Sequence, residues 1–220
     1  LVGSEMCIRD SFVTAKQGKP QSRICVLIPS FTYTVYANIA RGNTNKKMLE
    51  RIKEWSASPW TTDNFPQFGL STYNYHSDGS GISSSSRRRP ILTMRSNVIS
   101  YPGVPGSGCR HFPADSHLWY WLTTKGYEFD VITDDELHKY GLAAIEKYSV
   151  LLTCSHPEYH TPQSLNALQE YTNTGGHLMY LGGNGFYWKV AVSDVWPDAV
   201  EIRRGEGGIR AWASEPGEYY

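Results

Sequence analysis

The stretch that decides the fold is residues 150–159, which read VLLTCSHPEY. Its first half is a continuous apolar run, which is typical of a strand in a parallel sheet covered on both faces. Its second half is polar and contains an imidazole and a carboxylate two positions apart, at His156 and Glu158. Because ligands bind where the carboxyl ends of parallel strands open onto a crevice, we expect the active site here.

Strand and helix patterns alternate on both sides of this stretch. The predicted strands are residues 24–28, 129–132, 150–153 and 178–181. Between them, Asp115, Thr133 and Thr161 begin amphipathic helical patterns, and each has a short polar side chain that can cap a first turn. This order predicts the α/β class, with a parallel sheet flanked by helices. We expect the flavodoxin-like layer architecture found in glutamine amidotransferases.

Residues 56–90 break this regularity. They follow a helical pattern at residues 45–55 and are rich in serine, glycine, proline and tyrosine. A loop of this length within a compact domain is usually functional or disordered, so we predict a long irregular active-site insertion. Residues 1–10 resemble a translated sequencing-adapter string and are expected to be a non-native segment. Residues 11–220 are then expected to be an incomplete α/β catalytic domain.

Composition narrows the classes of partner. Acidic and basic residues balance at 21 each, which argues against nucleic acid or an anionic membrane as the main partner. The chain has no apolar run of about 18 residues and no secretory signal pattern, so we expect a soluble, cytoplasmic protein. The four cysteines (Cys7, Cys25, Cys109 and Cys154) show no CxxC spacing, so neither a zinc site nor a disulfide framework is indicated.

Five motifs occur in an order that resembles the N,N-dimethylformamidase large (beta) subunit family, in its catalytic C-terminal portion. They are YAN at 36–38, the segment 69–81 with HSDG at 76–79, HPEY at 156–159, GGNG at 182–185 and RRGEGG at 203–208. The resemblance covers about residues 24–220. It implies an iron-dependent amide hydrolase that converts a small N-substituted formamide, such as N,N-dimethylformamide, to formate and dimethylamine. It also implies a small partner subunit in a hetero-oligomer.

The same resemblance implies a mononuclear Fe(III) centre held by two phenolates and one carboxylate. Carried over by motif, the ligands are Tyr36, Tyr73 and Glu158, with Tyr33 and Tyr75 as alternates within each tyrosine pair. Three hard anionic oxygens suit a hard, highly charged cation. Such an ion would activate water and polarise an amide carbonyl.

His156 and Asn184 match family positions that line the pocket and assist hydrolysis. Asn184 could donate a hydrogen bond to the carbonyl oxygen as it gains charge, and His156 could relay a proton to the leaving amine. The roles of Arg203, Arg204 and Glu206 stay open.

Other interpretations stay open beside this one. Cys154 lies at a strand end, like the nucleophile of glutamine amidotransferases, but Leu152 and His156 occupy the flanking positions that need small residues. The aromatic loops could instead form a non-catalytic module that binds a carbohydrate or another small ligand. Glu158 could also be only a first-turn charge, and His156 a backbone-bonded residue at a strand end.

Overall fold

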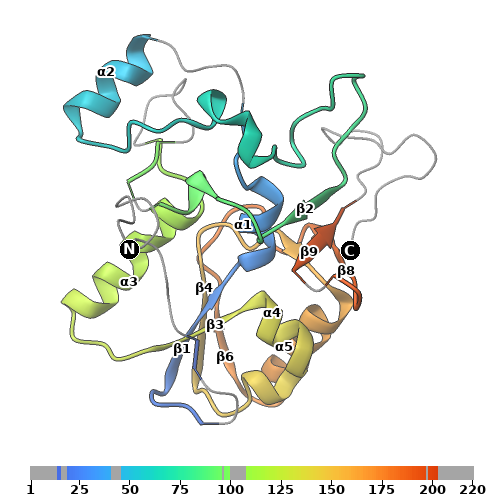
Figure 1. The fold of residues 1–220 in the computed structure, drawn as a ribbon. Helices are drawn as coiled ribbons and strands as arrows, with labels where there is room; N and C mark the ends of the chain where they lie inside the picture. Colours follow the sequence, from blue (N-terminus) through green and yellow to red (C-terminus); the bar gives the residue numbers. More distant parts are fainter. Residues whose placement is uncertain are drawn as a thin grey trace, which may run out of the picture.

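The structure is a computed structural model (Figure 1). It describes residues 14–15, 19–40, 46–95, 97–99, 108–196 and 198–202. The predicted non-native segment at residues 1–10 lies outside these ranges, as do Arg203, Arg204 and Glu206.

A four-stranded parallel sheet lies at the centre of the described chain. Its strands are β3 (Asp130–Thr133), β1 (Ile24–Ile28), β4 (Val150–Thr153) and β6 (His177–Met179), in that spatial order. All four predicted strands are therefore confirmed, but the last one ends at Met179 rather than at residue 181. Beyond Met179 the ladder is replaced by a side-chain contact, because the Leu181 amide donates to Thr153 Oγ1 at 2.9 Å.

Helices cover both faces of this sheet, as Figure 1 shows. Helix α4 (Asp134–Tyr140), η5 (Gly141–Ala144) and α5 (Pro162–Asn173) pack on one face, and α3 (Phe112–Thr124) packs on the other. Successive side chains of β1 alternate between the two cores: Cys25 and Leu27 join one, while Val26 and Ile28 join the other. Burial on both faces explains why the strand is apolar throughout. The α/β class is confirmed, and the closer likeness to glutamine amidotransferases stays a prediction.

The order of the strands creates a switch point between β1 and β4. From β1 the chain moves to β3 on one side and then returns to β4 on the other. In an open parallel sheet, such a reversal leaves a crevice at the carboxyl ends of the two central strands. Helix α1 (Ser30–Tyr36) follows β1 at this edge, and residues 154–158 follow β4.

A second core covers this edge of the sheet. It joins α1 to β5 (Tyr159–His160), β7 (Trp188–Lys189), β8 (Ala191–Val192) and β9 (Ala199–Glu201), and β2 (Ser84–Ser86) pairs with β9. The remaining elements are α2 (Lys46–Glu54), η2 (Thr62–Asn64), η3 (Pro66–Phe68) and η4 (Leu92–Met94). Residues 56–90, the predicted insertion, include η2, η3 and β2, and side-chain hydrogen bonds tie them to Ala37 and Asn38, which directly follow α1.

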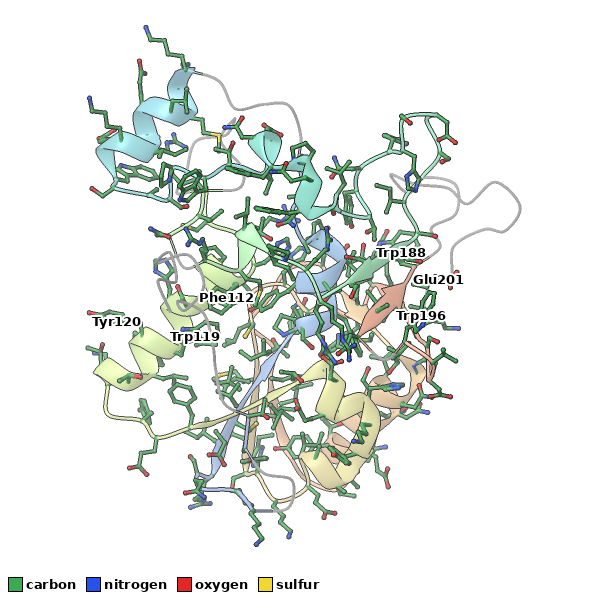
Figure 2. All side chains as sticks on the ribbon, in the orientation of Figure 1. Phe112, Trp119, Tyr120, Trp188, Trp196 and Glu201 are labelled. Atoms are coloured by element: carbon green, nitrogen blue, oxygen red, sulfur yellow. The ribbon has the colours of Figure 1, made fainter. Side chains whose placement is uncertain are left out.

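Helix α3 corrects one expectation. Asp115 was expected at its start as a cap, but the helix begins at Phe112, with Pro113 in its first turn. Asp115 is buried and binds groups outside the helix, as described below. The outer side of α3 carries Tyr120, which projects from the molecule in Figure 2. None of the helices in the described ranges is both long and apolar enough to cross a membrane.

Candidate active site

Four buried oxygen-bearing side chains meet at the switch point; we call Tyr36, Tyr73, Glu158 and Tyr159 the oxygen cluster. The Tyr36 hydroxyl donates to Glu158 Oε2 at 2.8 Å, across 122 positions of sequence. The rings of Tyr36 and Tyr73 are stacked, with centroids 4.1 Å apart and an interplanar angle of 14°. The hydroxyls of Tyr73 and Tyr159 share a hydrogen bond of 2.5 Å. Three distant segments therefore contribute to one site.

Helix α1 holds the backbone of Glu158 and Tyr159 directly. Thr32 is fully buried, and its Oγ1 accepts from the amide of Glu158 at 3.2 Å and from the amide of Tyr159 at 3.3 Å. Tyr36 is the last residue of the same helix, one turn beyond Thr32. The short helix therefore fixes both the phenol and the backbone of the segment that carries the carboxylate.

The end of α1 also places Tyr73. The Val35 carbonyl lies in the last turn of α1, where carbonyls lack helical partners. It accepts from Ser71 Oγ at 2.9 Å and from the Thr72 amide at 3.2 Å. Asn74 extends the attachment, because its Nδ2 donates to the Ala40 carbonyl. These contacts bring the irregular insertion over the helix end and stack Tyr73 on Tyr36.

Nitrogen-bearing side chains border the cluster. His156 Nε2 lies 3.0 Å from Glu158 Oε2 and 3.5 Å from Arg110 Nη2. A carboxylate only accepts, so this contact is made by a protonated Nε2, and in the neutral ring Nδ1 then carries the lone pair. Nδ1 faces the glycine turn, where a side chain at Gly183 would begin 3.9 Å away.

Arg110 and His111 were not recognised in the sequence, because neither belongs to a motif or a periodic pattern. The Arg110 guanidinium lies 5.1 Å from the centroid of the Tyr36 ring, and the His111 ring lies 4.3 Å from it. Arg110 Nε also donates to His111 Nε2 at 3.2 Å. Burial, together with Arg110 and His156, lowers the pKa of His111 well below its usual value. His111 is therefore a neutral contact of the cluster.

Burial sets the charge state of the phenols. It raises the pKa of Tyr36 well above the ordinary value, and Tyr73, Glu158 and Tyr159 raise it further. A phenolate at this position thus needs a cation beside it. In the described ranges, no group of three or more histidine, cysteine, aspartate or glutamate side chains could hold a metal. A metal at this site would therefore use tyrosine oxygens together with Glu158.

The alternate tyrosines lie elsewhere. The Tyr33 hydroxyl donates to Asp115 Oδ2 within the core under α3. Tyr75 is 53% exposed and forms an isolated bridge with Gly81. The geometry therefore favours Tyr36 and Tyr73 within each pair, and their roles as metal ligands stay predictions.

The glycine turn at residues 182–185 lies beside the segment that follows β4. The Gly183 amide donates to the Ser155 carbonyl at 3.0 Å, and a Cβ at Gly182 would meet Pro157 Cδ at 2.6 Å. Asn184 on this turn is exposed, and its side chain makes no hydrogen bond to the oxygen cluster among the described residues. Its predicted role thus requires that a substrate reach the turn.

Cys154 has the wrong environment for a nucleophile. The side chain is fully buried in the core under α3. Burial, followed by the charges of Asp115 and Asp134, raises the pKa of its thiol well above the ordinary value. The reactive form of a cysteine is the thiolate, so the geometry disfavours a Cys154-dependent amidase.

Comparisons with known proteins agree with these motifs. A family described as N,N-dimethylformamidase beta subunit-like, C-terminal, matches residues 4–220. The chain is 36% identical over 213 residues to an N,N-dimethylformamidase beta subunit of Paracoccus aminophilus, and 35% identical over 223 residues to one of an Alcaligenes species. Each match covers 95% of this chain and 27% of the relative, so the chain spans about a quarter of their length. The chain belongs to the N,N-dimethylformamidase beta subunit-like, C-terminal family.

Proposed function

We propose that this chain forms the active-site region of an iron-dependent amidase that hydrolyses a small N-substituted formamide, such as N,N-dimethylformamide, to formate and dimethylamine. The observation that carries the proposal is the meeting of Tyr36, Tyr73 and Glu158 in one buried cluster at the switch point of the sheet. The names of the two relatives support the same activity.

The donor set fits Fe(III). Two phenolates and one carboxylate are hard oxygen donors, and their three negative charges balance a trivalent cation inside a buried site. Tyr36, Tyr73 and Glu158 would hold the ion, and the hydrogen bond between Tyr36 and Glu158 would give way to ligation. The ion supplies Lewis acidity, which polarises the amide carbonyl and makes water more acidic.

The proton transfers fall to His156. In the overall reaction, a bond forms between the water oxygen and the carbonyl carbon, the C–N bond breaks, and a water proton ends on the amine nitrogen. In the neutral ring, His156 Nδ1 carries the lone pair and lies toward the glycine turn, while Nε2 bonds to Glu158. We assign Nδ1 the uptake of the water proton and its delivery to the leaving amine.

We assign Asn184 the role of stabilising the negative charge that develops on the carbonyl oxygen, by donating a hydrogen bond to it. It stands on the turn that packs against Ser155 and Pro157, and its side chain is exposed, so a substrate could reach its amide. One such donor typically contributes about 3 kcal/mol to the transition state.

We further propose a hetero-oligomeric assembly in the cytoplasm. The two relatives are named as beta subunits, which is consistent with a partner subunit of another type. The three proposed metal ligands, Tyr36, Tyr73 and Glu158, all belong to this chain.

Metal analysis and an amide assay of the full-length protein, purified with its partner chains, test the proposal. We expect bound iron, a visible phenolate-to-iron absorption band, and release of formate and dimethylamine from N,N-dimethylformamide. Glu158→Ala should lose both the iron and the activity, whereas Glu146→Ala, at an exposed glutamate, should lose neither. Undiminished hydrolysis by Glu158→Ala would remove the proposed site.

A further inference from the structure

We propose that Tyr159 is a positioning residue whose hydroxyl donates a hydrogen bond to the Tyr73 oxygen, so that Tyr73 binds the metal as a weaker electron donor and leaves the metal more Lewis-acidic. This inference rests on the proposed function and gives a role to the one residue of the oxygen cluster that the proposed function leaves without one. It begins from the 2.5 Å separation of the two phenol oxygens.

Tyr159 is held so that its hydroxyl has little freedom. The side chain is 0% exposed, and its ring packs edge-on against Tyr36 with centroids 6.1 Å apart. Its backbone is fixed from two sides, by Thr32 Oγ1 on α1 and by parallel pairing with Trp188 on β7. The hydroxyls of Tyr73 and Tyr159 are therefore both held in fixed orientations. A residue that orients a metal ligand through a hydrogen bond needs this rigidity.

The direction of the hydrogen bond follows from counting protons. A phenol hydroxyl carries one proton, and a phenolate carries none. When Tyr73 acts as an anionic ligand, its oxygen can only accept, so the proton in the pair must belong to Tyr159. A hydrogen bond to an ionised acceptor is stronger than one between neutral groups, so Tyr159 favours the anionic form of Tyr73.

The chemical consequence concerns the charge on Tyr73. A hydrogen bond to a phenolate draws electron density toward the donor and away from the metal. A metal bound there would be more Lewis-acidic and would polarise a carbonyl more strongly. Tyr159 would therefore affect the rate of hydrolysis without touching the substrate, and it would also change the energy of the phenolate-to-metal absorption band.

The matched comparison is Tyr159→Phe against Tyr171→Phe in the full-length protein with its partner chains. Both tyrosines are buried, at 0% and 1% exposure, and each hydroxyl is hydrogen-bonded. The Tyr171 hydroxyl donates to the Tyr148 carbonyl at 3.1 Å in the core under α4 and α5, away from the cluster. Both variants keep the ring and remove only the hydroxyl.

We expect Tyr159→Phe to retain iron, to shift its visible band to longer wavelength and to lower kcat roughly tenfold with little change in KM, the scale of one hydrogen bond to a charged group. Tyr171→Phe should leave the band and kcat unchanged. An unshifted band in Tyr159→Phe would overturn this inference alone. Loss of iron from a folded Tyr159→Phe would also overturn it, because Tyr159 would then be a ligand. A wild-type protein without iron would overturn this inference and the proposed function together.

Discussion

The amide of Ser155 donates to Asp115 Oδ1 at 2.7 Å, and this contact ties helix α3 to the segment that carries His156 and Glu158. The other oxygen of Asp115 accepts from the Tyr33 hydroxyl on α1. One buried carboxyl thus joins α1, α3 and the strand end, and it fixes the start of the segment that supplies the candidate proton-transfer group.

We predict that Asp115→Ala lowers the free energy of unfolding by about 2–4 kcal/mol, because a buried amide and a buried hydroxyl lose their acceptor. Asp115→Asn keeps an acceptor for Ser155 and should cost less. Urea unfolding of the full-length protein measures both, with Asp194→Ala, at an exposed position, as the control. Equal stabilities of Asp115→Ala and Asp194→Ala would show that the Asp115 contacts contribute nothing.

Tyr73 and Tyr75 form a natural pair for testing the ligand assignment. Tyr73 is buried in the cluster, whereas Tyr75, two positions later, is exposed. We expect Tyr73→Phe to weaken and shift the visible band, because only the Tyr36 phenolate would remain, and to lower kcat/KM by more than about 100-fold, since even changes around a ligand cost about 10–100-fold. Tyr75→Phe should match the wild-type protein. If Tyr75→Phe lowered activity and Tyr73→Phe matched the wild type, the metal ligand would be Tyr75 instead of Tyr73.

His160 should make stability depend on pH. Burial lowers its pKa to about 4 from the ordinary 6.5, and the hydrogen bond to the Pro157 carbonyl opposes this shift. Between pH 4 and 6.5 the unfolded chain binds the proton more readily than the folded chain does. The contribution of His160 is therefore present above pH 6.5 and is lost as the pH falls toward 4, by up to about 3 kcal/mol.

The measurement is urea unfolding between pH 4.5 and 7 for the wild type and for His160→Asn. Other groups also titrate in this range, so the difference between the two pH profiles isolates His160. We expect the free energy of unfolding of His160→Asn to fall less on acidification than that of the wild type. The control is His117→Asn, at an exposed histidine, which should show the wild-type pH profile. Parallel profiles of wild type and His160→Asn would contradict the shift.

Alanine substitutions at Gly69 and Gly79 can distinguish the effect of backbone strain from the effect of a side-chain contact. Both have positive φ, at 83° and 85°. A Cβ at Gly69 would lie 2.7 Å from Arg89 Nη1, whereas a Cβ at Gly79 would meet nothing within 4 Å. Arg89 Nη2 donates to the Ala37 carbonyl beyond α1, so moving its side chain loosens the attachment of the insertion.

Gly79→Ala should therefore lower the free energy of unfolding only by the strain of a left-handed backbone at a residue with a Cβ, about 1–2 kcal/mol. Gly69→Ala should cost more and should also reduce amidase activity, because the same insertion carries Tyr73. Unfolding free energies and kcat/KM of the two variants test this difference. A smaller effect at Gly69 than at Gly79 would mean that the Arg89 contact is unimportant.

Local patterns were sufficient for the four strands of the central sheet and for helices α2, α4 and α5, but they did not predict α1 or the short strands of the second core. The apolar runs predicted four strands because a strand buried on both faces must be apolar along its whole length. Thr133 correctly marked the start of α4, which begins at the next residue, Asp134. These signals lie within a few residues of the structures that they specify.

Asp115 shows where such signals fail. Its position suggested a cap, but its partners are Tyr33 and Ser155, which lie 82 and 40 positions away. No periodicity encodes those distances. Arg110, His111 and Tyr159 were missed for the same reason, although Tyr159 stood within the HPEY motif.

The sequence by itself determined the class of fold, the strand end at which to seek chemistry, and, through its motifs, the family. Only the tertiary structure decided that Tyr36 rather than Tyr33, and Tyr73 rather than Tyr75, lie with Glu158. The physical reason is that neighbouring tyrosines in a chain can point into different cores. Which core each one enters depends on the sheet order and on the contacts that close the insertion over α1.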